Sequence, residues 1–361
     1  MLSSVFLCLA VASLASSEFH PVFDGKVRKT ADGRYEAYLV PPAAANHASF
    51  LELLPSGELL LAWFSGTAEG ANNCSIVLAR LPAGGDQWSN SSLVSRRPGY
   101  SNQNPVLFLD STGQEVYLFH SQQPASSAES RWRPGSEEDK ANIWMLQSFD
   151  MGLNWTTPLD VFTTDGSFDR NRIIYSLMGD WIFPIYYAVE EDKDQYSTMM
   201  ISSDQRTWKP YPIPHSNYLI QPSVIRPHPS QPLLFAFLRD RQAQNIYTTS
   251  STDDGYTWTE PSPTKLPNNN AAIQACVLSN GHVVLVYNPT TGPRVPLRVS
   301  LSEDGGLSWL HSRDLETNGT EFSYPSLLQT PDSFIHVSYT YNRQTIKYVK
   351  FMESWIMDGQ D

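Results

Sequence analysis

The sequence predicts an all-β fold: a six-bladed β-propeller built from four-stranded antiparallel blades. Three observations support this prediction. A phrase of the form Ser-x-Asp-x-Gly-x-x-Trp returns along the chain, aromatic and β-branched residues fill short strand-like runs, and 26 prolines argue against long helices. The tryptophans that end the phrase recur at intervals of roughly 50 to 67 residues, which is typical of stacked units such as propeller blades.

The repeated phrase is a sequence motif with three complete and two incomplete copies. The complete copies are 148–155, 251–258 and 302–309, and the incomplete copies end at Trp208 and Trp88. Asp accepts hydrogen bonds from the backbone N–H groups of a turn, and Gly adopts positive φ without strain. The Trp ring covers the apolar side of such a turn. Each copy therefore predicts a tight hairpin turn with a structural role.

The elements follow one order in each unit: a strand, a turn, two further strands and then the phrase. The first two strands of the units are 51–54 and 59–64, 105–109 and 116–119, 224–227 and 233–238, 275–278 and 283–287, and 327–328 and 334–339. An extended segment at 18–23 precedes them, and 345–349 forms the last strand. Because closed propellers often complete one blade with both chain ends, we expect 18–23 to join the final strands. Five phrases and this shared blade give six blades, and the sequence leaves a count of five or seven open.

The first residues predict a secreted or lumenal protein. Residues 1–17 combine a short apolar run with small residues, which is typical of a signal peptide, and 18–361 are assigned to a single propeller domain. The run is too short to cross a bilayer, and no other transmembrane segment is predicted. Four Asn-x-Ser/Thr acceptor sequences agree with a secretory route, and they begin at Asn73, Asn90, Asn154 and Asn318.

Charge and cysteine content argue against several classes of protein. The net charge of −12 argues against nucleic-acid binding, which requires a basic surface. Without the leader, Cys74 and Cys276 remain, so the fold is not a disulfide scaffold, and the sequence leaves open whether these two pair. No cysteine–histidine spacing indicates zinc, and no glycine-rich phosphate loop is present, so neither a metal nor a cofactor is predicted. The oligomeric state stays open.

Polar and ionisable residues gather at the ends of the predicted strands. Inner strands converge on the axis of a propeller, so these positions meet at one mouth of the channel. For each residue alone, a capped turn or a solvated rim is the simpler interpretation, but recurrence at equivalent places favours a site. The residues are His47, Glu69, Asn104, Gln221, Arg239, Asp240, Arg241, Asn288, Arg294 and Tyr324.

Over about residues 47–345 the chain resembles the sialidase (neuraminidase) superfamily, whose Asp-box (BNR) repeat is similar to the repeated phrase. Sialidases hold the carboxylate of sialic acid with three arginines. The resemblance places Arg239 and Arg294 at two of these positions, with Arg241 as a rival for the first, and His47 at the third. Planar guanidinium groups suit this task because they bind a carboxylate with paired, charge-assisted hydrogen bonds.

The resemblance also assigns the reacting groups. Tyr324 matches the nucleophilic tyrosine, Glu69 matches the acid/base aspartate, and Gln221 matches the glutamate that assists the nucleophile. Gln accepts a hydrogen bond but takes no proton, so the Tyr324 phenol needs another source of activation. His47, Asp240 and Glu321 are the candidate substitutes. Asp240, Asn104 and Asn288 are also expected to contact the substrate.

Three functions fit these residues. The preferred one is a secreted exo-glycosidase that removes a terminal sugar, expected to be acidic, such as sialic acid, from a glycoprotein, glycolipid or polysaccharide. The first alternative is a uronate-directed polysaccharide lyase, or another glycosidase, on the same fold. The second is a glycan-binding propeller without catalysis. Because one fold carries many chemistries, the fold alone does not choose among them.

Overall fold

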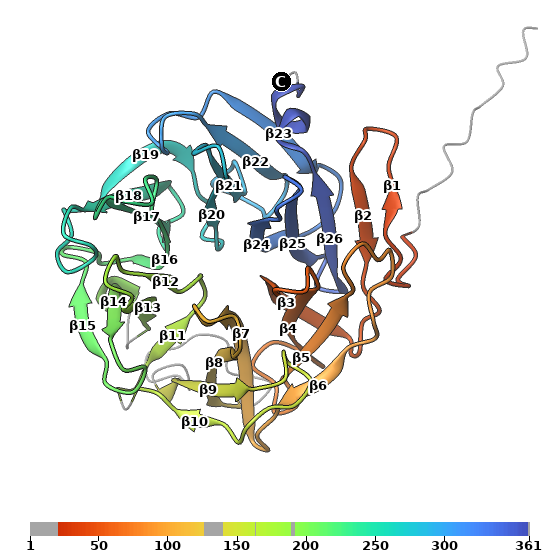
Figure 1. Ribbon diagram of the computed structural model, residues 1–361, viewed down its shortest axis with the longest axis horizontal. Helices are drawn as coiled ribbons and strands as arrows, with labels where there is room; N and C mark the ends of the chain where they lie inside the picture. Colours follow the sequence, from red (N-terminus) through yellow and green to blue (C-terminus); the bar gives the residue numbers. More distant parts are fainter. Residues whose placement is uncertain (1–20, 126–139, 163, 189–191, 360–361) are drawn as a thin grey trace, which may run out of the picture.

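The strands of the chain form six antiparallel sheets that surround a common axis (Figure 1). This is seen in a computed structural model that describes residues 21–125, 140–162, 164–188 and 192–359. The sequence-based prediction of an all-β, six-bladed propeller is confirmed. The predicted leader, residues 1–17, lies outside the described residues, and the division into leader and single domain stays a prediction.

Four blades are built from four consecutive strands each, with the first strand nearest the centre of the ring (Figure 1). Blade one contains β3 (Ala45–Leu53), β4 (Leu59–Gly66), β5 (Ser75–Leu81) and β6 (Ser92–Ser95). Blade two contains β7 (Tyr100–Leu109), β8 (Val116–Pro124), β9 (Asn142–Ser148) and β10 (Leu159–Asp160). Blade four contains β16 (Leu219–Ile225), β17 (Leu234–Asp240), β18 (Asn245–Ser251) and β19 (Ser262–Pro267). Blade five contains β20 (Gln274–Val277), β21 (Val283–Tyr287), β22 (Leu297–Ser302) and β23 (His311–Glu316).

Blade three has an interrupted inner strand. Two short strands, β11 (Ser167–Asp169) and β12 (Ile174–Tyr175), both pair with β13 (Trp181–Tyr187). A single 3₁₀ turn, η2 (Asp192–Asp194), follows β13, and β14 (Tyr196–Ser202) and β15 (Lys209–Pro212) complete the blade. The four residues between β11 and β12, 170–173, are therefore free of the sheet ladder and available for contacts across the channel.

The sixth blade closes the ring with strands from both parts of the chain. It orders β24 (Phe322–Gln329), β25 (Ile335–Tyr341), β26 (Thr345–Phe351), β2 (Tyr35–Tyr38) and β1 (Arg28–Lys29), and α1 (Glu353–Met357) follows β26. The expectation of a shared blade holds, but the strand that joins β26 is β2 rather than a strand at 21–23, and residues 18–20 of the expected strand lie outside the described residues.

The strand that joins β26 lies further along the chain than expected. Residues Pro21–Phe23 carry no strand, and β2 pairs with β26 through Tyr35 opposite Lys350 and Tyr38 opposite Lys347. Pro21 has no backbone N–H to donate to a ladder. Phe23 instead packs its ring against Tyr38, with 6.1 Å between the ring centroids.

The repeated phrase folds as a hairpin turn held by its own side chains. In the copy at 251–258, the Ser251 hydroxyl donates to the Asp253 carboxylate at 2.8 Å and accepts from the Gly255 N–H at 2.8 Å. Asp253 also accepts from the Thr257 N–H at 2.8 Å, and Gly255 has a φ of +94°. The Trp258 indole donates to the Gly255 carbonyl at 3.0 Å. Each residue type that defines the phrase therefore has a bonding or conformational reason.

These turns lie away from the mouth that carries the candidate site. The copies at 148–155, 251–258 and 302–309 each follow the third strand of a blade and precede the fourth. Neighbouring strands run antiparallel, so the inner strand and the third strand run in the same direction. The third strand therefore ends at the other end of the blade from the start of the inner strand. The repeated turns are thus structural elements at the far end of the blades.

Replacing Asp253 with Ala should lower the free energy of unfolding by about 1 kcal/mol, because the turn loses its cap. Denaturant unfolding measures this change, and Thr252→Ala, an exposed neighbour in the same turn, is the matched control. Turnover should be unchanged in both variants. A specific loss of activity at native stability in Asp253→Ala would contradict the structural role.

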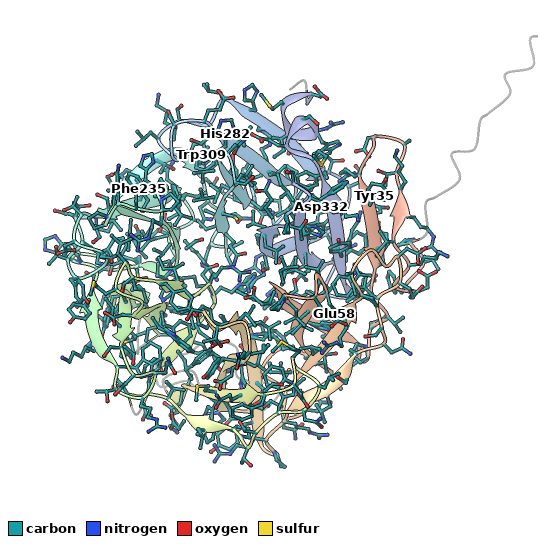
Figure 2. The ribbon with its side chains drawn as sticks, viewed as in Figure 1. Tyr35, Glu58, Phe235, His282, Trp309 and Asp332 are labelled. Carbon is teal, nitrogen blue, oxygen red and sulfur yellow. The ribbon has the colours of Figure 1, made fainter. Side chains whose placement is uncertain are left out.

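Hydrophobic side chains from neighbouring blades pack against each other and fill the ring. Trp309 of blade five, for example, lies against Phe237 of blade four, with 5.8 Å between their ring centroids in a T-shaped arrangement. Figure 2 labels Trp309 and Phe235, which belong to one apolar cluster shared by these two blades. Each blade buries its faces only against its neighbours, which is the packing expected of a propeller.

The two cysteines of the described chain are free thiols. Cys74 is buried and its thiol donates to the Ala68 carbonyl at 2.8 Å, while Cys276 is half-buried on β20. Cys74 and Cys276 therefore form no disulfide bond with each other, a point that the sequence left open. Within the described ranges, no helix is long and apolar enough to cross a membrane.

Candidate active site

The inner strands of four blades share a bulge near their starts. The ladder register shifts at this point between β3 and β4, β7 and β8, β16 and β17, and β24 and β25. At each shift one residue that is not glycine adopts a φ near +50°, and these residues are Ala48, Asn104, Gln221 and Tyr324. A bulge re-aims side chains and often lies next to a functional site. The repeat thus places Gln221 and Tyr324 at equivalent positions of blades four and six.

Arg239 joins the two side chains that the bulges present. Its Nη1 donates to the Tyr324 hydroxyl at 2.7 Å and to Gln221 Oε1 at 3.0 Å, and its Nε donates to Asn270 Oδ1 at 2.8 Å. Arg239 is buried at the end of β17. The rival Arg241 donates instead to Gln195 at 2.8 Å. Arg239, rather than Arg241, therefore contacts the candidate nucleophile.

The Tyr324 phenol is activated by charge. Burial alone would raise its pKa, but the positive charges of Arg239 and Arg294 outweigh burial and lower the pKa to about 8. The guanidinium carbons of Arg294 and Arg170 both lie 5.3 Å from the centre of the Tyr324 ring. The arginines thus supply the activation that Gln221 cannot give as a base.

His47 lies directly against the Tyr324 ring, with 4.1 Å between the ring centroids. Its Nδ1 shares a hydrogen bond of 2.7 Å with the Thr340 hydroxyl. Burial, followed by the charge of Arg343, holds the pKa of His47 well below its usual value, so its imidazole is neutral at pH 7. The buried Nε2 atom has no hydrogen-bond partner among the described residues. His47 therefore supplies no charge for a ligand carboxylate but leaves a polar nitrogen beside the phenol.

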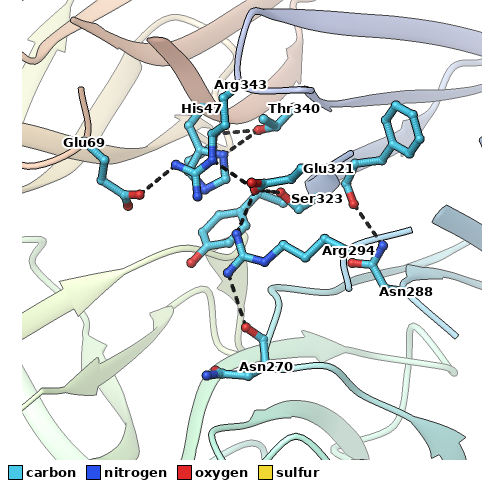
Figure 3. A network of polar contacts seen from close by, with 12 residues as sticks. His47, Glu69, Asn270, Asn288, Arg294, Glu321, Ser323, Thr340 and Arg343 are labelled. Carbon is cyan, nitrogen blue, oxygen red and sulfur yellow. Dashed lines mark hydrogen bonds and ion pairs between the residues drawn. The ribbon is translucent and has the colours of Figure 1, made fainter. Parts of the chain in front are cut away.

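A chain of ion pairs crosses the mouth of the site (Figure 3). Arg343 Nη1 donates to Glu69 Oε2 at 2.6 Å, and Arg343 Nε donates to Glu321 Oε1 at 3.0 Å. The same Glu321 oxygen accepts from Arg294 Nη1 at 2.9 Å. Burial alone would raise the pKa of Glu321, but Arg343 and Arg294 lower it below its usual value. Glu321 thus stays ionised and holds two guanidinium groups side by side.

Asp240 serves a turn rather than the channel. Its carboxylate oxygens accept the backbone N–H groups of Gln242 at 2.8 Å and Gln244 at 3.0 Å, directly after β17. A capped turn is the simpler interpretation of a single polar residue at this position, and these two bonds agree with it. Both carboxylate oxygens thus accept bonds from this turn, and the substrate contact predicted for Asp240 stays a prediction.

The two predicted asparagines are buried. Asn288 Nδ2 donates to the carbonyls of Pro296 at 2.8 Å and Phe322 at 2.9 Å, which ties the loop after β21 to the start of β24. Asn104 occupies the bulge position of β7. Asn288 therefore supports the strand that carries Tyr324, and the substrate contacts predicted for both asparagines stay predictions.

The interrupted strand of blade three sends side chains across the channel. Arg170 is buried and donates to the carbonyls of Ser49 at 3.2 Å, in blade one, and Pro325 at 2.9 Å, in blade six. Asn171 Nδ2 donates to the Gln221 carbonyl of blade four at 2.8 Å. These bonds tie blade three to blades one, four and six. They hold the backbone at Pro325, directly after Tyr324, and at Gln221 itself.

Comparison with known proteins places the chain in a family. A family model described as "BNR repeat-like domain" matches residues 57–337. This chain belongs to the BNR repeat-like domain family. No curated protein matches the sequence of this BNR repeat-like protein. Several solved structures share its fold at low sequence identity, so this similarity shows the fold alone.

Three of these structures illustrate the likeness. A Hadza microbial sialidase matches with a TM-score of 0.73 at 17% identity, over 87% of this chain and 67% of that chain. The NanB sialidase of Streptococcus pneumoniae matches with a TM-score of 0.73 at 14% identity, over 93% of this chain and 71% of that chain. A protein of unknown function from Dyadobacter fermentans matches with a TM-score of 0.73 at 18% identity, over 90% and 98%.

The structure adds residues to the site of this BNR repeat-like protein that the sequence analysis did not name. They are Arg170, Tyr186, Asn270 and Arg343. Arg343 follows the strand predicted at 334–339, so the rule that found Arg239 after its strand would have found it too. Arg170 gave no such signal, because no strand pair was recognised in blade three.

The assembled site is cationic and polar. Guanidinium groups of Arg170, Arg239 and Arg294 surround one phenol, and Arg343 lies at the mouth with Glu69 and Glu321 as its counter-ions. Such a cluster suits an anionic ligand whose carboxylate accepts several charge-assisted hydrogen bonds. In the part of the chain that the structure describes, no group of His, Cys, Asp and Glu residues could hold a metal ion.

Proposed function

We propose that this BNR repeat-like protein is a secreted or lumenal exo-glycosidase of the sialidase type. It hydrolyses the bond of a terminal acidic sugar, sialic acid or a similar one, on a glycan. The observation that carries the proposal is a buried phenol with a lowered pKa beside arginines: Tyr324 accepts from Arg239 at 2.7 Å and faces Arg294. Arginine groups bind the sugar carboxylate while the phenol reaches the adjoining carbon.

The reaction then needs two groups of this chain. The Tyr324 oxygen attacks as the phenolate and forms a bond to the anomeric carbon. The bond to the leaving oxygen breaks as Glu69, in its protonated form, gives that oxygen a proton. In the second half, water attacks the same carbon, Glu69 takes the proton of the water, and Tyr324 is released. The Glu69 side chain is 45% exposed, which suits a group that meets the leaving glycan on the solvent side. Gln221 orients Arg239 and takes no proton.

The test is product analysis on a panel of glycans. The secreted protein is incubated with sialylated and uronate-containing glycans, and the products are identified by mass. Release of the free acidic sugar, with addition of one water, supports the proposal. A product of unchanged total mass that absorbs in the near UV would replace hydrolysis with elimination. Binding without any product would leave a glycan-binding propeller.

The rate should depend on pH through the Tyr324 phenol. Its pKa is lowered to about 8, so the phenol is protonated below this pH and anionic above it. With an aryl sialoside, the leaving group departs without a proton from Glu69. If the anion attacks, kcat/KM for this substrate rises with pH and reaches half of its alkaline limit near pH 8, because kcat/KM reports the free enzyme. The measurement is a pH profile with a fast-reacting sialoside. A profile that is flat between pH 7 and 9 would exclude the phenolate as the attacking form.

A lyase is the second candidate, and His47 favours it. A neutral, buried imidazole with an unpartnered Nε2 atom lies 4.1 Å from the Tyr324 ring centre and can accept a proton. In a lyase the arginines neutralise a uronate carboxylate, a base removes the proton beside it, and the bond to the leaving oxygen breaks to give an unsaturated uronate. His47→Gln separates the two functions. This change should abolish an elimination and only slow a hydrolysis.

A further inference from the structure

Arg343 occupies a backbone position that is costly for its residue type. It lies in the hairpin between β25 and β26 with a φ of +60°, next to Asn342 with a φ of +50°. Gly and Asn tolerate this left-handed region, whereas a long side chain such as Arg is strained there. Residues held in such conformations cluster at functional sites. The outlier therefore points to a role for the Arg343 side chain.

The hairpin holds Arg343 beside the start of β3. The Asn46 N–H donates to the Arg343 carbonyl at 2.8 Å, and the charge of Arg343 is the largest contribution, after burial, to the lowered pKa of His47. Its guanidinium therefore lies next to the position where His47 offers no charge. Arg343 is thus placed to supply a cation there from a different strand.

The two ion pairs of Arg343 differ in their exposure to solvent. Glu321 Oε1 accepts from Arg343, from Arg294 and from the Ser323 hydroxyl at 2.7 Å, and its side chain is 21% exposed. Glu69 holds the other side of Arg343 at 2.6 Å, but the Glu69 side chain is 45% exposed. Exposed pairs contribute little because water and salt screen them. The Glu69 pair is therefore the one that an entering carboxylate would replace.

We propose that Arg343 is a latch that a ligand carboxylate opens. Without ligand, Arg343 holds Glu69. A sugar carboxylate takes the place of Glu69 on the guanidinium. The freed Glu69 carboxylate then takes up a proton from solvent, and it can pass this proton to the leaving oxygen. The proposal rests on the proposed function and adds a specificity device to it. An uncharged sugar leaves Glu69 bound to Arg343. Such a sugar should therefore show a lower kcat as well as a higher KM than an acidic sugar.

The latch makes a prediction that a purely structural ion pair does not. Glu69→Gln removes the competitor for Arg343, so N-acetylneuraminic acid should bind about three- to tenfold more tightly, although turnover is lost. Arg343→Gln should weaken binding of the same sugar roughly tenfold or more, and it should reduce the preference for the acid over its methyl ester. Titration calorimetry on the full chain measures both affinities.

The controls separate this inference from the function beneath it. Arg206→Gln removes the same charge on an exposed turn at the far end of blade three and should leave the affinity unchanged. If the parent protein binds and cleaves sialosides but Glu69→Gln binds the sugar no more tightly, the latch is wrong and the hydrolase stands. If the parent protein neither binds nor cleaves acidic sugars, both the proposed hydrolase function and the latch are wrong.

Discussion

Tyr324→Phe should reduce kcat by about three orders of magnitude or more, because the variant lacks the oxygen that attacks the anomeric carbon. The fold should persist. Phe keeps the ring against His47, and Arg239 keeps its hydrogen bonds to Gln221 and Asn270. Single-turnover kinetics on a sialylated glycan, alongside a thermal melt, measures the two effects separately.

The matched control is Tyr348→Phe. Tyr348 is also buried, and its hydroxyl shares a hydrogen bond of 2.7 Å with His336, but it lies in blade six outside the site. This control should keep full activity while losing a buried hydroxyl. Full activity in Tyr324→Phe would remove the phenol from the mechanism, whatever the stability of the variant.

Arg239→Gln should move the pH profile strongly to the alkaline side. Burial by itself raises the pKa of the Tyr324 phenol, and Arg239 is the largest charge that lowers it to about 8. Without this charge the pKa returns to its usual value of about 10 or above. The anionic fraction at pH 7 then falls roughly a hundredfold, and kcat/KM should fall with it. The rate should recover in part as the pH is raised.

Arg239→Lys provides the comparison for this change. Lys keeps the positive charge but cannot donate from a planar fork to Tyr324, Gln221 and Asn270 together. Its pH profile should stay close to that of the parent, while its KM rises. An equal alkaline shift in both variants would mean that position 239 acts through geometry rather than charge.

The repeated turns could be predicted from the sequence because their bonds are local. Ser251, Asp253 and Gly255 interact within a few residues of one another, so residue type and spacing carry the full information. The amino-terminal strand of the closing blade was misplaced for the opposite reason. Several short segments before residue 47 have apolar residues, and only pairing with β26 selects 35–38 over 18–23.

The candidate site could be predicted in part. Tyr324, Arg239, Arg294 and His47 were placed together on the rule that polar residues at inner-strand ends share one mouth, and the structure brings them together. The pairing of Arg343 with Glu69 joins residues 274 positions apart, and no local pattern indicates it. Arg170 was missed because its strand is interrupted.

The sequence by itself determined the repeated blade unit, the turns and the residue types available at the channel mouth, since these depend on short-range periodicity and turn chemistry. Only the tertiary structure decided how those residues act. The pKa of Tyr324 depends on the distances to Arg239 and Arg294, which lie on other blades. Electrostatic interaction depends on separation in space and on burial, and both are set when the ring closes.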